Sequence, residues 1–486
     1  MNFQMILNIL GLVMTFEGAF LMLPCMTALI YWEQEGFAYL GVAILCLIIG
    51  RILNLKKASS KSIYAKEGFA IVALSWILLS IFGALPFVIS GDIPSYIDAL
   101  FEIISGITTT GASILSDVEQ LSHTSLLWRS FSHWFGGMGV LVFIMSIMPL
   151  TKGRNIHLMR AESPGPSVEK LFPKVKHTAL FLYSAYLILT VIQIILLVLG
   201  NVSVFESINI AFATAGTGGF SIRNSGFADY SPYVQYVTSI FMILFGVNFN
   251  VYFLLIIKRF KEALTFEELR HYLLIIAIAV LAITWNIRHL FPTLEESFRH
   301  ALFQLSSLMT TTGFASTDFD LWPALSKNIL LLIMFIGACA GSTGGGIKVS
   351  RIALLFKGIR MELIRSCHPN SVHTIKYNQN IVSRDLMRSV YAFIGVYIII
   401  FCSSQLLLSL NGYDFTTNFT AVAATLNNIG PGLEKVGPTC NFGFFSVFSK
   451  LVLMFDMLAG RLELFPILLV FSPHFWVGDK HFIHKR

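Results

Sequence analysis

The sequence has little charge. Lys, Arg, Asp and Glu together make up 13% of its 486 residues, about half of the roughly 25% that soluble globular domains carry. It also contains no long polar linker. Apolar residues account for 55% of the chain, and the mean hydropathy is +0.72. The shortage of charge excludes an ordinary soluble protein, and the missing linkers predict one membrane domain rather than the roughly three soluble domains that the length suggests.

Several functional signatures are missing as well. The sequence contains no phosphate-binding loop, nucleophile elbow or metalloprotease helix, so we expect neither an enzyme, nor ATP hydrolysis by this chain, nor a bound cofactor. Four histidines share no metal-ligand spacing: His123, His133, His300 and His368. The six cysteines have no metal or redox spacing, and we expect them to be small apolar fillers in membrane helices: Cys25, Cys46, Cys339, Cys367, Cys402 and Cys440.

The N-terminal segment is not expected to be a cleaved signal. It lacks a basic leading segment and a clear small-residue cleavage site, and its apolar run from Phe3 exceeds a normal signal core. Several apolar stretches reach the roughly 20 residues that span hydrocarbon. Examples are Ile6–Tyr31, Phe69–Ile89 and Ala179–Leu199, while Leu273–Trp285 is shorter and needs its flanks. These stretches predict an all-α polytopic membrane protein.

The basic residues are unevenly distributed. Of the 34 Lys and Arg residues, 26 lie in five segments: Arg51–Lys66, Lys152–Lys176, Lys258–Arg270, Lys348–Arg388 and Lys480–Arg486. The alternate connections Gly91–Ser125 and Asn201–Gln235 hold almost none, but they carry the acids Asp92, Asp98, Asp117 and Glu206. This asymmetry is the positive-inside pattern, so we expect both termini in the cytoplasm and the acids outside, where they would raise the local cation concentration. The net charge of +7 then needs no nucleic-acid partner.

The chain repeats itself. Two leading spans in residues 1–67 precede four similar units, at residues 68–150, 178–260, 271–355 and 384–476. Each unit is expected to contain a full span, a short outer segment, a Thr/Gly-rich stretch and a second full span. The short segments, such as Tyr96–Ser105 and Ser297–Leu308, are better read as re-entrant. Because irregular backbone at membrane depth must be buried or line a water-filled path, four such segments predict a pore with pseudo-four-fold arrangement.

The Thr/Gly-rich stretches of the four units have similar sequences. The first and third units contain Thr-Thr-Thr-Gly, ending at Gly111 and Gly313, and in both a Phe lies ten residues before the Gly. The second unit offers Gly-Thr-Gly-Gly-Phe-Ser from Gly216, and the fourth offers Asn-Asn-Ile-Gly, ending at Gly430. Aligned on the glycines, the four key positions are Gly111, Gly218, Gly313 and Gly430.

These residues suit a desolvated potassium ion. Potassium filters replace the ion's water with rings of backbone carbonyls, and glycine lets successive carbonyls point at one axis. Threonine hydroxyls add oxygens, and a helix that ends before each stretch directs its negative end at the pore. The alternative is that Thr and Gly only ease helix packing, but four copies at equivalent places favour the pore.

Two further motifs complete a family resemblance. They are Ala-Gly-Ser-Thr-Gly-Gly-Gly-Ile-Lys at Ala340–Lys348 and Gly-Arg-Leu-Glu at Gly460–Glu463. With the four repeats, they resemble the Trk/Ktr/HKT potassium transporter superfamily over essentially the whole chain, and the two leading spans resemble its bacterial Trk branch. The resemblance implies a potassium filter formed by Thr109, Thr110, Gly111, Thr217, Gly218, Thr311, Thr312, Gly313, Asn428, Ile429 and Gly430. Within it, K⁺ is expected at Thr110, Gly111, Thr217, Gly218, Thr312, Gly313, Ile429 and Gly430.

The resemblance also bears on selectivity. Family members with serine at the first filter glycine tend to admit sodium, so Gly111 argues for potassium. The fourth stretch, Asn-Asn-Ile-Gly, departs from the Thr-rich pattern, and each repeat has one filter glycine where tetrameric channels have two. Discrimination against sodium is therefore expected to be modest.

A glycine run interrupts the second span of the third unit. Residues 337–346 contain five glycines, and each costs about 0.8–1.0 kcal/mol relative to Ala inside a helix. The run is either a close helix contact or an intramembrane loop, which the resemblance supports as a gate. The gate residues are expected to be Gly337, Gly341, Gly344, Gly345, Gly346, Lys348 and Arg461, although Lys348 can equally begin the cytoplasmic face.

Arg461 stands between two apolar runs, where a charge is expensive and indicates function. One interpretation is structural pairing with Glu463 or Asp456; the other, implied by the resemblance, is a pore-facing barrier to cations. The function expected is potassium translocation across a bacterial inner membrane, with a proton- or sodium-coupled symporter as the alternative. An intramembrane enzyme is disfavoured, because the titratable residues within the spans lack a nucleophile partner.

The expected partners follow from the resemblance and from the loops. Trk-type proteins work as homodimers with a cytosolic ring of nucleotide-binding subunits, so a homodimer, an NAD- or ATP-binding regulatory subunit and membrane lipid are expected. Lys152–Lys176 and Lys348–Arg388 are candidate docking segments, or they only fix the topology.

Overall fold

The computed structural model describes residues 1–56, 65–139, 175–369, 373–378 and 380–476. The regular elements in this part of the chain are helices, apart from one two-stranded hairpin. It contains six helices that are long and apolar enough to cross a membrane, or seven if one bent pair counts as a span. The helical membrane fold is thus confirmed. Basic segment Lys480–Arg486 and most of Lys152–Lys176 lie outside the described residues.

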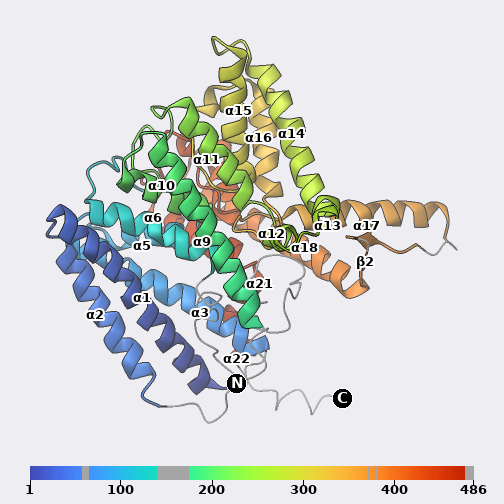
Figure 1. Cartoon of the computed structure of the whole chain (residues 1–486). Helices are drawn as coiled ribbons and strands as arrows, with labels where there is room; N and C mark the ends of the chain where they lie inside the picture. The colour runs from blue at the N-terminus through green and yellow to red at the C-terminus, as the bar shows by residue number, and fades with distance from the viewer. Residues whose placement is uncertain (57–64, 140–174, 370–372, 379, 477–486) are drawn as a thin grey trace, which may run out of the picture.

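The two leading spans form a helical hairpin at one edge of the molecule (Figure 1). They are α1 (Phe3–Tyr31) and α2 (Gly36–Leu53). The helices approach closely, because a Cβ added to Gly11 would lie 2.9 Å from the carbonyl oxygen of Gly50. Small residues allow such backbone contact in membranes. One charged residue was not anticipated: Glu17 of α1 is 1% exposed.

Each unit begins with a long helix followed by a short one. The long helices are α3 (Ala65–Gly83, continued by α4, Leu85–Ser90), α9 (Val175–Leu199), α14 (Glu267–Ile287) and α18 (Arg384–Ser409). The short helices are α5 (Tyr96–Ile107), α10 (Val204–Gly216), α15 (Leu294–Met309) and α19 (Phe415–Leu426). The side chain of the residue before each short helix caps it, as hydroxyl and carboxylate groups do well: Ser95, Ser203, Thr293 and Asp414. The short segments predicted at Tyr96–Ser105 and Ser297–Leu308 are therefore confirmed as helices.

The second span of the third unit is interrupted at the predicted glycine run, and those of the second and fourth units are interrupted as well, which was not predicted. The helices that follow the Thr/Gly-rich stretches are α6 (His123–Met138), α11 (Pro232–Phe245), α16 (Ala324–Ile336) and α20 (Val447–Arg461). In three units the helix after the glycine segment ends at a break, and another helix follows the break. The break after α11 turns the chain by 90° into α12 (Phe249–Ile256), and residues with positive φ end α16 at Gly337 and separate α20 from α21 (Phe465–Phe471) at Glu463 and Leu464. Hydropathy alone does not report such breaks, because both halves are apolar.

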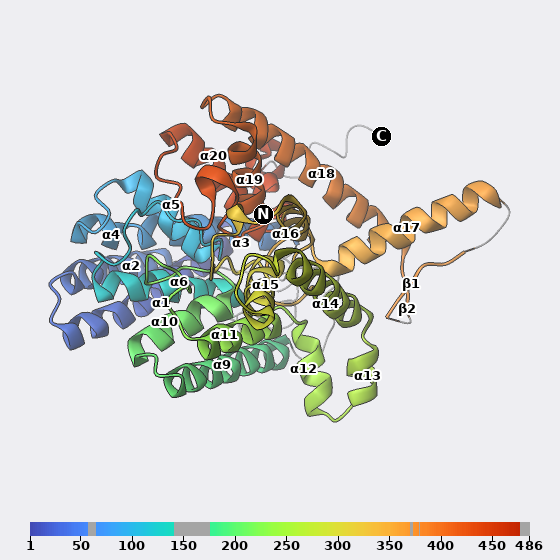
Figure 2. The same ribbon diagram turned by 90° about the horizontal axis from the view of Figure 1, so that it is seen from above.

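The remaining elements lie around these units. They are α13 (Phe260–Thr265), α17 (Val349–Cys367), α22 (Pro473–Trp476), the 3₁₀ turns η1 (Phe319–Leu321) and η2 (Glu434–Val436), and strands β1 (Lys376–Tyr377) and β2 (Asn380–Ile381). The strands pair antiparallel, with Lys376 opposite Ile381. Helix α17 projects from the rest of the molecule, with the hairpin beside it (Figure 2).

The cysteines divide into two groups. Cys25 and Cys46 are buried in α1 and α2, as expected of fillers. Cys402 also lies in a candidate span, α18, on its exposed side. The prediction is wrong for the other three: Cys339 is buried in an irregular loop, and Cys367 and Cys440 are exposed outside the candidate spans.

Candidate functional site: four glycine segments and a glycine-rich loop

The four short helices end in the same backbone motif. After each helix one non-glycine residue takes a left-handed conformation, with φ of 55–59°: Thr109, Thr217, Thr311 and Asn428. The next residue donates its N–H to the carbonyl five residues back at 2.8 Å, as in a Schellman C-cap: Thr110 to Ser105, Gly218 to Ala213, Thr312 to Ser307 and Ile429 to Ala424. Left-handed backbone at a non-glycine residue costs on the order of 1–3 kcal/mol and is typical of functional sites.

A glycine with positive φ follows two residues after each left-handed residue. The four are Gly111, Gly219, Gly313 and Gly430. The alignment of Gly218 with Gly111 was therefore wrong by one residue, and Gly218 instead occupies the position of Thr110 and Thr312. The Gly-Gly pair made the register ambiguous. The residues that follow the Gly-Gly pair were enough to choose the register, because Gly219-Phe220-Ser221 matches Gly313-Phe314-Ala315.

These glycines connect each unit to the next. A Cβ added to Gly111 would overlap the carbonyl oxygen of Gly218, and one added to Gly219 would overlap that of Thr312. The same holds for Gly313 and the carbonyl of Ile429. The series closes on the first unit, since a Cβ on Gly430 would lie 2.8 Å from the carbonyl oxygen of Thr110. The four glycine segments (residues 108–113, 216–221, 310–315 and 427–432) thus form a closed cycle of contacts.

Side chains differ between the glycine segments. In the first and third, the threonine hydroxyls pair across one residue, at 2.8 Å for Thr108 and Thr110 and at 2.7 Å for Thr310 and Thr312. The fourth lacks threonine, and its Asn428 instead donates to the Thr110 hydroxyl at 2.9 Å. All five of these residues are fully buried. Asn428, where the fourth stretch departs from the Thr-rich pattern, therefore forms a direct hydrogen bond to the first glycine segment.

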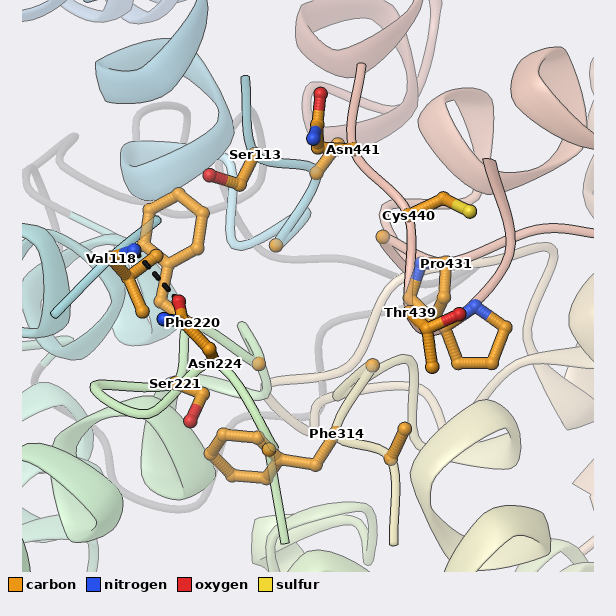
Figure 3. A pocket seen from close by; sticks show the side chains of 18 of the residues that line it. Ser113, Val118, Phe220, Ser221, Asn224, Phe314, Pro431, Thr439, Cys440 and Asn441 are labelled. Carbon is orange, nitrogen blue, oxygen red and sulfur yellow. Dashed lines mark hydrogen bonds between the residues drawn. The ribbon is translucent and has the colours of Figure 1, made fainter. Parts of the chain in front are cut away.

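The glycine segments surround a cavity of about 440 Å³. All four positive-φ glycines line this cavity. Figure 3 shows other lining residues, among which Ser113, Phe220, Phe314 and Pro431 come one from each glycine segment. Its charged lining residues are Arg129, Arg223 and Asp318. Both arginines are paired with glutamates, so the cavity presents little free positive charge.

His133 joins helix α5 to the second glycine segment, and sequence reasoning missed this role. This residue of α6 is fully buried, with Nδ1 2.7 Å from the Gly106 carbonyl and Nε2 accepting the Phe220 N–H at 3.2 Å. One nitrogen donates and the other accepts, which is the pattern of a neutral imidazole. The ring also occupies the space where a Cβ on Gly218 would lie. Nothing in the local sequence reveals a contact between residues 87 positions apart.

A buried ion pair supports the same region. Glu102 of α5 and Arg129 of α6 lie 2.8 Å apart with side chains 0% and 2% exposed. Glu102 also accepts the Ile114 N–H at 3.0 Å, and Arg129 donates to the Ser221 carbonyl at 3.3 Å. The pair therefore ties the first glycine segment to the second. The sequence offered a signal for it, because an acid and a base stand in otherwise apolar segments.

The outer acids are mostly engaged. Asp117 accepts a hydrogen bond from the Asn224 side chain at 2.7 Å, which lowers the pKa of its carboxyl group below the ordinary value and keeps it ionised at neutral pH. Two of the four predicted cation-attracting acids face basic partners, in the ion pairs Asp98–Lys450 (2.6 Å) and Glu206–Arg223 (2.7 Å).

The glycine-rich loop (residues 337–348) lies against the glycine segments. Its Gly345 N–H donates to the Thr311 hydroxyl at 2.6 Å, and a Cβ on Gly344 would lie 2.9 Å from the Thr310 carbonyl. The loop is irregular between α16 and α17, as its glycine content predicted. Positive φ angles occur at Gly337, Gly341, Gly346 and Lys348. Lys348 is 1% exposed and donates to the Gly344 carbonyl, so it belongs to the loop and does not begin an aqueous face.

Arg461 fastens this loop to another unit. Its guanidinium donates to the Thr343 carbonyl at 2.8 Å and to the carbonyls of Gly136 and Gly137, at the end of α6, at 2.6 and 2.5 Å. The two acids considered as its partners have other contacts: Glu463 forms an ion pair with Arg351, and Asp456 accepts from the Ser404 hydroxyl at 2.6 Å. The side chain thus joins the first, third and fourth units.

Comparisons with known proteins agree along the whole chain. A family model described as TrkH, cation transport protein, matches residues 36–476. The Trk system potassium uptake protein TrkH of Salmonella typhimurium is 36% identical over 98% of this chain and 100% of its own length, and TrkI of Halomonas elongata is 30% identical over 97% and 96%. The crystal structure of the potassium transporter TrkH from Vibrio parahaemolyticus superposes with a TM-score of 0.89 at 33% identity, covering 98% of this chain and 100% of that one.

Proposed function

Because this chain belongs to the TrkH family of cation transport proteins, and is thus an integral membrane protein rather than an enzyme, we propose that it is the pore-forming subunit of a potassium uptake system. Ions pass a filter made by the four glycine segments, which stand in pseudo-four-fold arrangement around one pore. The observation that carries this proposal is their closed cycle of contacts, from Gly111 through Gly219 and Gly313 to Gly430.

The filter replaces the water of the ion with backbone oxygens. The carbonyls of Thr110, Gly218, Thr312 and Ile429 are the ligands proposed at the level of the glycines, and those of the four left-handed residues add a second level. Each short helix ends at this level, so its negative end favours a cation there. Carbonyl rings of this kind select potassium, and with one glycine in each segment the discrimination against sodium is modest.

The glycine-rich loop is the gate. It lies directly against the Thr310 and Thr311 backbone and side chain, and so stands in the path of an ion that leaves the filter. Arg461 holds the loop and places a permanent positive charge beside the path, because a guanidinium stays protonated at physiological pH.

A proton-coupled symporter is the second candidate. The observation that favours it is a pair of buried carboxyl groups inside spans, Glu17 and Asp456, which are 1% and 0% exposed. Among the described residues, neither oxygen of Glu17 and only one oxygen of Asp456 has a hydrogen-bond partner. Groups of this kind can carry protons through a membrane protein.

The proposed setting follows the relatives, whose names place them in a Trk system. The subunit resides in the bacterial inner membrane with both termini in the cytoplasm, forms a homodimer and binds a cytosolic nucleotide-binding subunit. Within Lys348–Arg388, Lys348 and Arg351 are buried, and Lys357 is paired with Glu267. The exposed docking candidates are Arg360, Arg365, Lys376, Arg384 and Arg388.

Reconstitution in liposomes tests the proposal. Potassium and sodium fluxes are measured on the purified protein while proton movement is recorded in parallel. A potassium flux that exceeds the sodium flux, without proportional proton movement, supports the pore. Proton movement in fixed ratio to potassium supports the symporter, and the absence of any cation flux contradicts both.

A further inference from the structure

One buried carboxylate holds both ends of the glycine-rich loop. Glu268, in the first turn of α14, is 2% exposed. Its Oε1 accepts the Ala340 N–H at 2.7 Å and the Ser350 N–H at 3.1 Å. Ala340 lies near the start of the loop, and Ser350 is the second residue of α17, just beyond the loop's end. A single oxygen thus bridges the two sides of the loop.

The same carboxylate reaches the break in the second unit. Its Oε2 lies 3.4 Å from the Asn248 side-chain amide, between α11 and α12. The adjacent Phe249 N–H donates to the Gly341 carbonyl at 3.1 Å, so the loop is attached to that break as well. Glu268 therefore stands where the third unit, its loop and the second unit meet.

Both ends of the loop are buried, with Ala340 7% and Ser350 2% exposed. A cavity of about 250 Å³ lies beside them, and its lining includes Glu268, Ala340 and Ser350 together with Tyr377, Asn378, Asn380, Ile381 and Val382 of the hairpin region. The hydrogen bonds to the carboxylate hold the loop ends beside this open volume, together with the bond from the Val349 N–H to the Ala338 carbonyl at 3.1 Å.

We infer that Glu268 is the latch of the gate: its charge keeps the glycine-rich loop beneath the filter in the closed state. The inference rests on the proposed gate. Hydrogen bonds to an ionised acceptor are about twice as strong as those to a neutral one, so a neutral residue of the same shape holds the loop less firmly. The loop then leaves the path more often, and basal flux rises.

The test compares Glu268→Gln with Glu267→Gln in liposomes, without a regulatory subunit. Glu267 is a matched control, because the neighbouring carboxylate binds Lys357 and the Asn378 N–H rather than the loop. We expect Glu268→Gln to raise basal potassium flux about tenfold, since two charge-assisted hydrogen bonds become neutral ones. The control should stay at the wild-type level.

Cys339 provides a second readout within the loop. Its side chain is 0% exposed, so its modification by a thiol reagent reports displacement of the loop. Mass spectrometry separates it from the exposed Cys367, Cys402 and Cys440. Faster labelling of Cys339 is expected in Glu268→Gln and not in Glu267→Gln.

Deleting Gly341–Gly345 in parallel separates the latch from the gate. If the deletion raises flux while folded Glu268→Gln matches wild type in both flux and Cys339 labelling, the latch is wrong and the gate stands. If neither variant raises flux, the gate itself fails. Should Glu268→Gln not fold, Glu268→Asp replaces it. The shorter side chain keeps the charge but withdraws it from the N–H groups of Ala340 and Ser350, so flux and Cys339 labelling should again rise.

Discussion

Left-handed threonine is the unusual choice at the end of the short helices. Glycine is the common residue at this position because it adopts positive φ without strain. Thr109, Thr217 and Thr311 instead accept a cost on the order of 1–3 kcal/mol each. At Thr311 the hydroxyl accepts the Gly345 N–H, so the side chain that causes the strain also connects the filter to the loop. Glycine there would lose this connection.

Gly111→Ser should reduce the preference for potassium over sodium. Gly111 has φ of 79°, and any Cβ there overlaps the Gly218 carbonyl oxygen, so serine must displace a proposed ion ligand. Relative permeability measured in liposomes checks this. Gly91→Ser is the matched control, because Gly91 has φ of 86° but nothing lies within 4 Å of its Cβ position. If folded Gly111→Ser keeps the wild-type permeability ratio, the filter assignment is wrong.

His133→Phe should lower both stability and selectivity. The substitution keeps a ring of similar size but leaves the Gly106 carbonyl and the Phe220 N–H without their partner, which costs about 1–3 kcal/mol for each buried group. Thermal unfolding and the potassium-to-sodium flux ratio are the measurements. His300→Phe is the control, because His300 bonds one side chain, Ser316, within its own unit. An unchanged flux ratio in His133→Phe would refute a role in positioning the filter.

At the scale of elements, the helices with strong local signals and the glycine-rich interruption were predictable, and the breaks without such a signal were not. The segments Tyr96–Ser105 and Ser297–Leu308 have apolar runs of limited length, and α5 and α15 confirm them. The loop between α16 and α17 was also predictable, because five glycines in ten residues cannot support a helix. The 90° turn between α11 and α12 was missed, since Gly246 is a single weak signal in an apolar run.

Deleting Gly341–Gly345 should raise basal potassium flux. The deletion removes the carbonyl that binds Phe249, the carbonyl that binds Arg461 and the N–H that binds Thr311. Without these three hydrogen bonds, the shortened loop no longer fills the space beneath the filter. Flux is measured in liposomes without a regulatory subunit. A folded deletion variant that conducts less than wild type would reject the loop as an obstruction.

At the scale of the whole molecule, the contacts between units could not be predicted from the sequence. The bond from Asn428 to Thr110 joins residues 318 positions apart, and that from Lys450 to Asp98 joins residues 352 positions apart. A single sequence holds no local pattern for such pairs, whereas the repeats themselves appear as similar letters. The four glycine segments could therefore be located from the sequence, whereas the side chains that connect one segment to another could not.

Arg461 is the residue where these connections converge, and its removal should increase the rate of potassium transport. The guanidinium binds carbonyls of the first and third units from the fourth. The repulsion energy between its charge and a cation about 8 Å away is roughly 2 kcal/mol at an effective dielectric constant of about 20. Arg461→Ala removes both the charge and the hold on the loop, whereas Arg461→Lys keeps the charge and should stay near wild type. Initial rates of flux in liposomes are the measurement.

The structural interpretation of Arg461 makes the opposite prediction. If the side chain acts as a brace, its loss leaves the carbonyls of Thr343, Gly136 and Gly137 unpaired, which costs about 1–3 kcal/mol for each one that stays buried. Arg461→Ala would then unfold at a lower temperature and gain no flux. Thermal stability and flux measured on the same purified variant separate the two interpretations. A stable protein with faster flux establishes the barrier, because removing a side chain that braces the fold must lower its stability.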